Sequence, residues 1–531
     1  MGKRAEQAKK RRRLNAGPAK SFSCLPSPPT PNGQDEGGSN AEPTSLVSSE
    51  DLETTLYVLK MLSENPDEMA DKRMKDLKRG IYDLHRVLMD GATLGNSLTS
   101  KVSAALQDYR FTDALIHLFE MYTRRMPPKL GALQRWVREC DATSNVDGSR
   151  DTEALLCLDM ILRIATMDAG ASGKKDEKRQ GDEGEIIKRK AVWQAEEAER
   201  ENEIKIWERM QAGTLFETSP PNPYPNFKAV HHTPGPQRRP PNLYSSTVYA
   251  SAPGTILLEP ASTRTVPTKI DVPAVPGCFM VKDVFTPHEC LQIAQAAHAI
   301  GFEMDQAAGG SATMKSSILA KNFLWLADSH FLDHFYAQIL PFVPQHAPLS
   351  MDGNGGGRVR GINARFRVYQ YTENQVYRPH IDGAWPAAGL DPVTGEYLHD
   401  SSPPEDPLWS RYTLLVYLNS DIPTDTGCTT FFLPSENVGT MEATSVRPLQ
   451  GAVLCFREAS LLVYHTHGLT VTAHGDTHGS LLHEGSAVGA GGGKLVIRTD
   501  LLYEAKGFGE FKPPNSVGVM QGGKAEEGIG G

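Results

Sequence analysis

The stretch RFRVYQYTENQVYRPHID, residues 365–382, is the part of the sequence that says most about the fold. Arg365 to Tyr371 alternates as a strand does, and His380-Ile381-Asp382 follows. In a strand, positions i and i+2 point to one face, so His380 and Asp382 could hold one metal while Ile381 points away. The motif alone is weak, because a second copy, His474-Gly475-Asp476, occurs in a Gly-, Thr- and His-rich stretch that we expect to be a loop.

Short β-rich runs separated by Gly and Pro surround this stretch after Ile270. Pro287 to Ile300 is predicted to be a helix with proline in its first turn. Many short strands with turn signals predict a sandwich or a barrel. The predicted strands cover residues 279–284, 365–371, 412–418, 429–433, 452–456 and 494–502.

Several blocks in this region together resemble the prolyl 4-hydroxylase-like 2-oxoglutarate/Fe(II) dioxygenases. Residues 365–383 resemble the family's first metal-binding strand, and the resemblance extends from Val281 to Glu504. The Gly-Gly-x-Thr-x-Phe segment of the family is matched with Cys428 in place of the second glycine. The other matching blocks are residues 412–419, 448–456, 483–488 and 494–503.

The resemblance implies a double-stranded β-helix, or jelly roll, with flanking helices. It implies Fe(II) bound by His380, Asp382 and His483. Two histidines and one carboxylate form the facial triad of non-heme Fe(II) oxygenases, which leaves coordination positions open. In the family, 2-oxoglutarate and O₂ use these positions, and ascorbate is a further candidate cofactor.

The far carboxylate of 2-oxoglutarate meets a basic residue on the last strand in this family. Lys494 and Arg498 share one face of that strand but lie about 13 Å apart, so only one can be the direct partner. The spacing from His483 to Lys494 is one residue longer than usual, and the Gly489–Gly493 run could absorb it. We favour Lys494, with Arg498 in reserve. Tyr371 matches the tyrosine that donates to the same carboxylate.

The family reaction converts 2-oxoglutarate to succinate and CO₂ and hydroxylates a second substrate. The resemblance suggests a peptidyl, prolyl-like target, although a fold does not determine function. The insertion at residues 391–409, Pro- and Asp-rich, is a candidate lid. An inactive β-domain in an interaction protein is the main alternative, suggested by Cys428, the extra glycine-run residue and the insertions after Leu390 and Phe456. A cupin-like zinc hydrolase, using a metal-bound water, is another.

The rest of the chain has a different character. At 531 residues it allows three or four domains. We expect a disordered basic and Pro/Ser-rich tail over 1–50, an all-α domain over 51–170, a charged helix over 171–215, a Pro-rich linker over 216–269, the dioxygenase domain over 270–507 and a disordered Gly-rich tail over 508–531. Residues 102–140 resemble one pentatricopeptide unit. Such units contact RNA, and the alternative is an ordinary helical hairpin that packs on its neighbours. We expect the helical domain as a whole to recruit a protein partner or substrate.

Charge and cysteine content bear on location. Residues 1–20 carry eight Lys or Arg and one Glu, or +7, so the remainder of this −9 chain carries −16 and is not a general nucleic-acid binder. The basic cluster Lys9-Lys10-Arg11-Arg12-Arg13 is a candidate nuclear localisation signal or a solvated tail. No apolar run is long enough to span a membrane. Seven cysteines without a Cys-x-x-Cys pair favour a reducing intracellular compartment, nucleus or cytoplasm.

Overall fold

The computed structural model describes residues 48–65, 68, 71–82, 84, 97–141, 151–165, 186–195, 202–217, 222–238, 241–306, 320–347, 357–457, 460–466, 469–476 and 481–505. The basic cluster at residues 9–13, the Gly-rich segment 508–531 and nearly all of segment 1–50 lie outside these residues. The chain forms two compact units, residues 1–87 and 88–531, and each is described by itself.

The first unit contains the helix α2 (Ser49–Glu64) and the 3-10 helix η2 (Lys72–Met74). α2 begins after Ser48, whose side-chain oxygen accepts a hydrogen bond from the Asp51 amide at 3.1 Å. Serine is a favoured N-cap because it satisfies one of the amides that the helix leaves free. α2 agrees with the helical structure expected at the start of segment 51–170.

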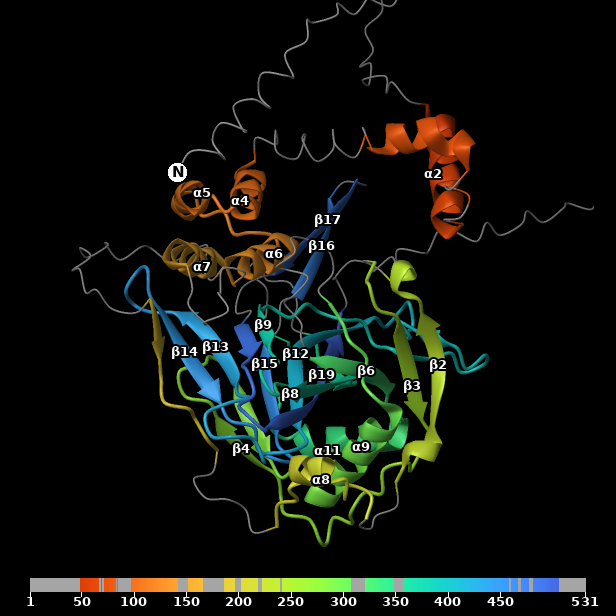
Figure 1. Ribbon diagram of the computed structural model, residues 1–531, viewed down its shortest axis with the longest axis vertical. Helices are drawn as coiled ribbons and strands as arrows, with labels where there is room; N and C mark the ends of the chain where they lie inside the picture. Colours follow the sequence, from red (N-terminus) through yellow and green to blue (C-terminus); the bar gives the residue numbers. More distant parts are fainter. Residues whose placement is uncertain are drawn as a thin grey trace, which may run out of the picture. The chain divides into compact units, whose positions relative to one another are not determined.

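The second unit is built on two β-sheets (Figure 1). The smaller sheet contains, in order, β1 (Ile187–Arg189), β14 (Met441–Val446), β13 (Thr429–Pro434), β18 (Leu482–Gly485) and β9 (Tyr377–His380). The larger contains, in order, β2 (Phe227–Thr233), β3 (Ser246–Ser251), β6 (Lys321–Leu326), β8 (Arg365–Thr372), β19 (Gly493–Glu504), β12 (Leu408–Tyr417), β15 (Val453–Arg457), β5 (Phe279–Lys282) and β4 (Thr268–Asp271), with β7 (Val359–Ile362) beside β19.

The centres of the two sheets have an antiparallel arrangement consistent with a jelly roll. β8, β19, β12 and β15 are successive antiparallel neighbours in the larger sheet. β9, β18, β13 and β14 have the same relation in the smaller sheet. The strands predicted from the sequence are all present, with ends shifted by a few residues.

Alternation along β19 shows how the larger sheet is packed. Successive side chains of a strand point to opposite faces. Leu495 and Ile497 belong to the core that the sheet shares with its helices, whereas Val496 belongs to the core between the sheets. Lys494 and Arg498 share the face of Val496, so the strand carries its basic side chains into the space between the two sheets.

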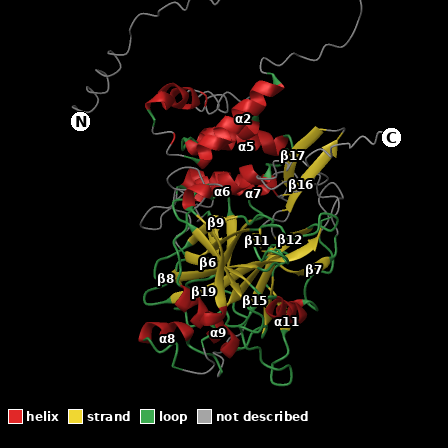
Figure 2. Cartoon of the chain, turned by 90° about the vertical axis from the view of Figure 1, so that its right-hand side faces the viewer, coloured by secondary structure: helices red, strands yellow, loops and turns green. Residues whose placement is uncertain are grey.

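Helices cover the outer face of each sheet (Figure 2). The larger sheet packs against α8 (Ile206–Ala212), α9 (Pro287–Ile300) and α11 (Ser329–Ile339). The smaller sheet packs against α6 (Leu130–Asp141) and α7 (Thr152–Ala165), and α4 (Leu98–Gln107) and α5 (Phe111–Thr123) pack on these two helices. Ile381, Phe432 and Leu482 join the apolar core of the four helices. The order of layers is thus helices, sheet, sheet, helices.

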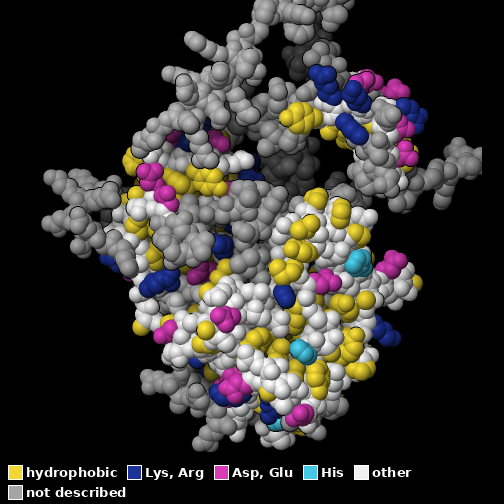
Figure 3. Space-filling model, in the orientation of Figure 1, with side chains coloured by type: hydrophobic (Ala, Val, Ile, Leu, Met, Phe, Trp, Pro, Cys, Tyr) yellow, Lys and Arg dark blue, Asp and Glu magenta, His cyan; other side chains and the backbone are white. Residues whose placement is uncertain are grey.

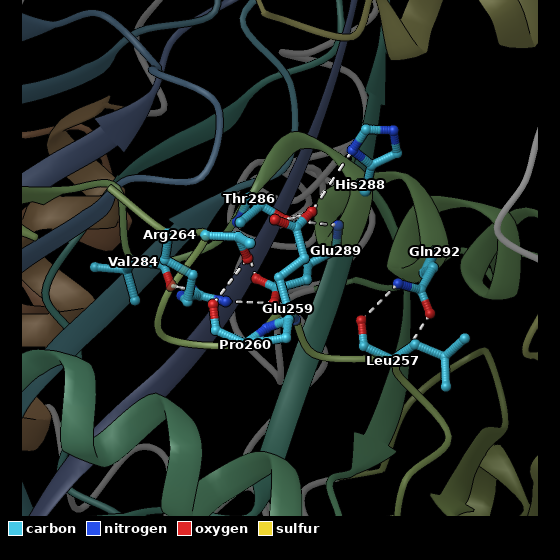
Figure 4. A network of polar contacts seen from close by, with 10 residues as sticks. Leu257, Glu259, Pro260, Arg264, Val284, Thr286, His288, Glu289 and Gln292 are labelled. Carbon is cyan, nitrogen blue, oxygen red and sulfur yellow. Dashed lines mark hydrogen bonds and ion pairs between the residues drawn. The ribbon is translucent and has the colours of Figure 1, made fainter. Parts of the chain in front are cut away.

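A polar network fixes the start of α9 (Figure 4). Thr286 Oγ1 accepts from the Glu289 amide at 3.3 Å, and the Glu289 carboxylate accepts from the Thr286 amide at 2.9 Å. This is a capping box, which satisfies two otherwise free amides. Glu289 also forms a buried ion pair with Arg264, and Gln292 exchanges two hydrogen bonds with the Leu257 backbone. The predicted helix 287–300 is confirmed, and it holds the preceding loop in place.

The charged helix expected over 171–215 is wrong for the residues that the structure describes. Residues 187–189 form β1 in the smaller sheet, and Trp193 makes a parallel bridge to Val446. Among the described residues of this segment, only Ile206–Ala212 forms an α-helix. Glu–Lys pairs stabilise a helix by only a few tenths of a kcal/mol, so burial of Ile187 and Trp193 on the sheet outweighs them.

The Pro-rich segment expected to be a linker, residues 216–269, supplies two strands of the larger sheet, β2 and β3, and the first two residues of β4. β2 and β3 form a hairpin at one edge, β3 runs parallel to β6, and β4 lies at the other edge. The prolines of the segment flank these strands, and edge positions tolerate such interruptions. The proline content therefore indicates strands near the edges of the sheet here, and the expected connector is wrong.

Two further expectations are corrected by the packing. The segment 51–170 is not one all-α domain, because α2 belongs to the first unit and α4–α7 pack on the smaller sheet. The second His-x-Asp motif is not in a loop: it lies in β17 (Leu469–Asp476), paired with β16 (Ser460–Thr466). Hydrogen bonding across this hairpin outweighs the turn propensity of its glycines.

No helix among the described residues is long and apolar enough to cross a membrane. Six cysteines in the described part of the chain are buried, and none of them forms a disulfide with another described residue.

Candidate active site

Three predicted metal ligands meet between the two sheets. His380 is the last residue of β9 and pairs directly with His483 on β18, and Asp382 lies two residues beyond His380. One ligand atom from each residue lies within 4.8 Å of the others. Asp382 is 3.6 Å from Nε2 of each histidine, through Oδ1 to His380 and Oδ2 to His483.

The backbone fixes which nitrogen of each histidine faces this point. His380 Nδ1 lies 2.9 Å from the Arg378 carbonyl oxygen, and His483 Nδ1 lies 3.0 Å from that of Leu481. A carbonyl can only accept, so Nδ1 carries the hydrogen and Nε2 keeps its lone pair. Burial lowers the pKa of both imidazoles, which keeps them neutral. Both side chains are therefore prepared as metal ligands.

Asp382 is held as a carboxylate. Burial acts to raise its pKa, but Arg498, with Nε 3.7 Å from Asp382 Oδ2, and the two histidines outweigh burial and hold the pKa below its ordinary value. Thr413 Oγ1 also donates to Oδ2 at 2.8 Å. Two neutral imidazoles and one oriented carboxylate are a donor set that fits Fe(II).

These residues open into a cavity of about 400 Å³. β8, β9, β18 and β19 form most of its wall, and α6 closes another side. Beyond the triad, the lining includes Leu130, Gln134, Arg138, Arg365, Arg367, Tyr369, Tyr371, Tyr377, Trp385, Thr429, Glu484, Lys494 and Arg498. None of residues 391–409, the expected lid, is among the lining; part of that insertion forms a small hairpin of β10 (Gly389–Leu390) and β11 (Tyr397–Leu398).

Lys494 lies opposite Tyr371 in the pairing of β19 with β8. It is 2% exposed, and its Nζ lies 5.3 Å from the Tyr371 ring centre and 5.5 Å from that of Tyr417. Burial lowers the pKa of Lys494 to about 8. The structure gives its ammonium group no hydrogen bond or ion pair with another described residue. A buried cation without an anion is costly, so this position suits an anionic ligand.

Glycines make room around this position. A Cβ on Gly485 would lie 2.9 Å from the Tyr371 hydroxyl oxygen, so the tyrosine reaches the cavity only because residue 485 lacks a side chain. A Cβ on Gly493 would lie 2.1 Å from the ring of Trp207, which packs there from α8. The glycine run thus keeps Lys494 and Tyr371 in register while α8 covers the turn.

Arg498, the reserve candidate, is already engaged. Its Nη2 lies 2.9 Å from Asp500 Oδ1, and its Nε faces Asp382. The two basic residues that the sequence could not separate therefore have different surroundings: Lys494 is open to a ligand, whereas Arg498 is compensated by two carboxylates.

Sequence reasoning missed several lining residues. Arg365 and Arg367 alternate in step with Tyr371 on β8, and this alternation could have placed them on the same face. Gln134 and Arg138 come from α6, and no motif marks them. Gln134 Nε2 donates to the carbonyl of Ile381, between two metal ligands, at 3.1 Å.

Comparison with known proteins gives only structural likenesses: no family model and no curated protein matches the sequence. A collagen prolyl hydroxylase of Paramecium bursaria Chlorella virus-1, in complex with 2-oxoglutarate, is 18% identical, covers 45% of this chain and 97% of its own, and gives a TM-score of 0.24. A Trichoplax adhaerens prolyl hydroxylase, bound to a hypoxia inducible factor peptide, is 15% identical, covers 46% and 86%, and gives 0.26. A Pseudomonas putida prolyl-4-hydroxylase is 14% identical, covers 45% and 93%, and gives 0.23. The case for a function therefore rests on the geometry of the site.

Proposed function

We propose that the protein is an Fe(II)- and 2-oxoglutarate-dependent dioxygenase that hydroxylates a peptidyl, prolyl-like substrate and forms succinate and CO₂. One observation carries the proposal: a buried His380, Asp382 and His483 set, with both Nε2 lone pairs directed inward, opens into the same cavity as the uncompensated ammonium group of Lys494.

The metal and its co-substrate would supply the oxidising chemistry with O₂, and the protein supplies position and shelter. His380, Asp382 and His483 would hold Fe(II). Thr413 and Arg498 hold the Asp382 carboxylate in place and charged. Burial between the sheets limits the contact of the triad with bulk solvent, which limits side reactions.

Lys494 and Tyr371 would bind the far carboxylate of 2-oxoglutarate. The ammonium would give a charge-assisted hydrogen bond, and the phenol is a neutral donor because burial raises its pKa well above the ordinary value. Arg498 is then a positioning residue for Asp382. This division of roles follows from which cation already has a carboxylate partner.

The experiment that tests the proposal measures succinate formed from 2-oxoglutarate by the full chain. Protein is loaded with Fe(II) and ascorbate without oxygen, and O₂ is then added. We expect slow turnover that His380→Ala abolishes, because many enzymes of this kind consume 2-oxoglutarate slowly without their second substrate. If the wild-type protein binds neither Fe(II) nor 2-oxoglutarate, the proposal is wrong and the interaction-protein alternative is supported.

A zinc hydrolase would use the same three ligands with a metal-bound water. The uncompensated Lys494, fully buried beside Tyr371, favours a bound carboxylate over that alternative. The two are separated by the metal that supports turnover and by whether 2-oxoglutarate disappears.

The proposal includes nuclear location, directed by residues 9–13, and ascorbate as a supporting reductant. A reporter fused to residues 1–20 should enter the nucleus; one that stays in the cytoplasm removes this part. The helices of residues 97–165 are proposed to serve the protein substrate rather than RNA, since they pack on the smaller sheet as ordinary hairpins.

A further inference from the structure

Arg365 is a second uncompensated cation in the cavity. It lies six residues before Tyr371 on β8, about 20 Å along the strand, so it lines the other end of the same wall. Its side chain is 9% exposed. The structure gives its guanidinium group no hydrogen bond or ion pair with another described residue. The guanidinium group lies over the ring of Trp385, with Cζ 4.3 Å from the ring centre.

The stacking on Trp385 sets how Arg365 can bind. A guanidinium that lies on an aromatic ring keeps the N–H donors along its edge free, and these donors match a carboxylate in a fork geometry. A buried charge left without a partner lowers stability, so its retention at a cavity wall points to a ligand that supplies the partner. The wall is rigid here because β8 is paired on both sides.

Two buried carboxylates near this wall already pair with other cations: Asp305 lies 3.6 Å from Arg367, and Asp500 lies 2.9 Å from Arg498. Asp500 acts on Arg365 only through a longer-range charge interaction and forms no ion pair with it. Five basic side chains line the cavity against two acidic ones, Asp382 and Glu484. Fe(II) and dianionic 2-oxoglutarate cancel each other in charge, so the lining stays positive when both are bound.

Arg138 adds to this end of the cavity from α6. Its side chain is half-buried in the cavity lining, and it too has no ion pair with another described residue. Over the β-sheet unit, the face shown in Figure 3 carries basic and acidic side chains scattered singly. This face therefore carries no broad basic field of the kind that binds nucleic acid.

We propose that Arg365, stacked on Trp385 and assisted by Arg138, binds a carboxylate of the substrate, so that the enzyme selects an acidic substrate. The inference rests on the proposed function and deepens it: Lys494 serves the co-substrate at one end of the wall, and Arg365 serves the substrate at the other. The carboxylate can belong to an Asp or Glu side chain of a peptide or to a free carboxylic acid.

The test uses the full chain loaded with Mn(II), which binds like Fe(II) without oxidation, and 2-oxoglutarate. One arm selects from a library of short peptides with a central proline and randomised flanks. The other arm measures the shift of the unfolding midpoint caused by free mono- and dicarboxylic acids added to the loaded protein. Binding of Mn(II) and 2-oxoglutarate is measured first, because its failure contradicts the proposed function and not this inference alone.

We expect Asp or Glu to be enriched in the selected peptides, or a free acid to raise the midpoint, depending on the source of the carboxylate. Arg365→Gln should reduce the preference about tenfold, the loss of one charge-assisted pair, while Arg365→Lys retains part of it as a point charge. Arg138→Gln should reduce it less. Arg135→Gln, an exposed arginine on the same helix, is the matched control and should change nothing.

Loaded wild-type protein that shows neither acidic enrichment nor a response to free acids overturns the inference. An acidic preference that persists in Arg365→Gln also overturns it. If Arg365→Gln does not fold, Arg365→Lys and Arg138→Gln provide the test. An acidic preference that is unchanged in both variants contradicts the proposal that Arg365 binds the substrate carboxylate. If Arg365→Gln loses 2-oxoglutarate binding while Lys494→Met retains it, Arg365 binds the co-substrate. That result would reject the proposal that Lys494 binds 2-oxoglutarate and Arg365 binds the substrate.

Discussion

The two walls of the cavity are built in different ways. On the strand wall, β8, β9, β18 and β19 present functional side chains at every second position, and backbone pairing fixes the distance between strands. On the helix wall, α6 approaches through side chains alone, with Gln134 reaching the Ile381 carbonyl across 247 residues of sequence. The strand wall therefore carries the groups that need fixed geometry, whereas the helix wall acts on the metal ligands only through side-chain contacts such as that of Gln134.

The largest expected effect is on the strand wall. His483→Ala removes one of the three proposed metal ligands, so the affinity for Mn(II) or Fe(II) should fall by more than about 100-fold. Loss of a residue that only hydrogen-bonds to a metal ligand costs less, about 10- to 100-fold. Isothermal titration calorimetry with the metal ion measures the affinity. His288→Ala is the control, because this histidine on α9 has a 59% exposed side chain. Unchanged metal affinity in His483→Ala would remove the metal site.

The next effect separates the two basic residues of β19. Lys494→Met should weaken 2-oxoglutarate binding about 10- to 100-fold, the loss of a charge-assisted hydrogen bond, and leave metal affinity nearly unchanged. Arg498→Met should weaken metal binding instead, because Asp382 loses its neighbouring cation. The reverse pattern, read from the same binding titrations, would make Arg498 the co-substrate partner.

The pH dependence tests the same end of the wall. Only the ammonium form of Lys494 binds a carboxylate well, and the bound carboxylate raises the pKa of Lys494 above its free value of about 8. Affinity for 2-oxoglutarate is therefore full below that pH and falls as pH rises through it, by up to about tenfold per pH unit. Binding titrations from about pH 7 to about pH 9.5 measure this. Lys494→Arg keeps its charge and should flatten the profile; a flat profile in the wild-type protein contradicts the assignment.

The smallest effect is on the helix wall. Gln134→Ala removes one hydrogen bond to the Ile381 carbonyl, which is worth about 1 kcal/mol, so metal affinity should fall about fivefold. The measurement is the same metal titration. Arg135→Ala, the exposed neighbour, should have no effect. A loss as large as that of His483→Ala would show that α6 is part of the metal-binding structure itself.

The sequence alone determined the strand wall. Because a strand repeats every two residues, alternation could place His380 and Asp382 on one face, and Lys494 and Arg498 on one face. His483 was assigned to the same site only by the resemblance. The structure brings these residues together, as the resemblance implied. The roles of Lys494, Arg498 and Tyr371 remain predictions for the binding experiments.

Only the tertiary structure decided the rest. Gln134 and Arg138 of α6 reach the cavity because apolar α4–α7 cover the smaller sheet, a contact that no local pattern encodes. Ile187 and Trp193 joined a sheet although their segment has helical charge spacing, since burial against distant strands outweighs local propensity. Likewise, Lys494 and Arg498 are equivalent in periodicity, and only the position of Asp500 beside Arg498 leaves Lys494 as the cation without a partner. Short-range spacing fixes which face a side chain occupies; the charges that meet it across that face come from elsewhere in the chain.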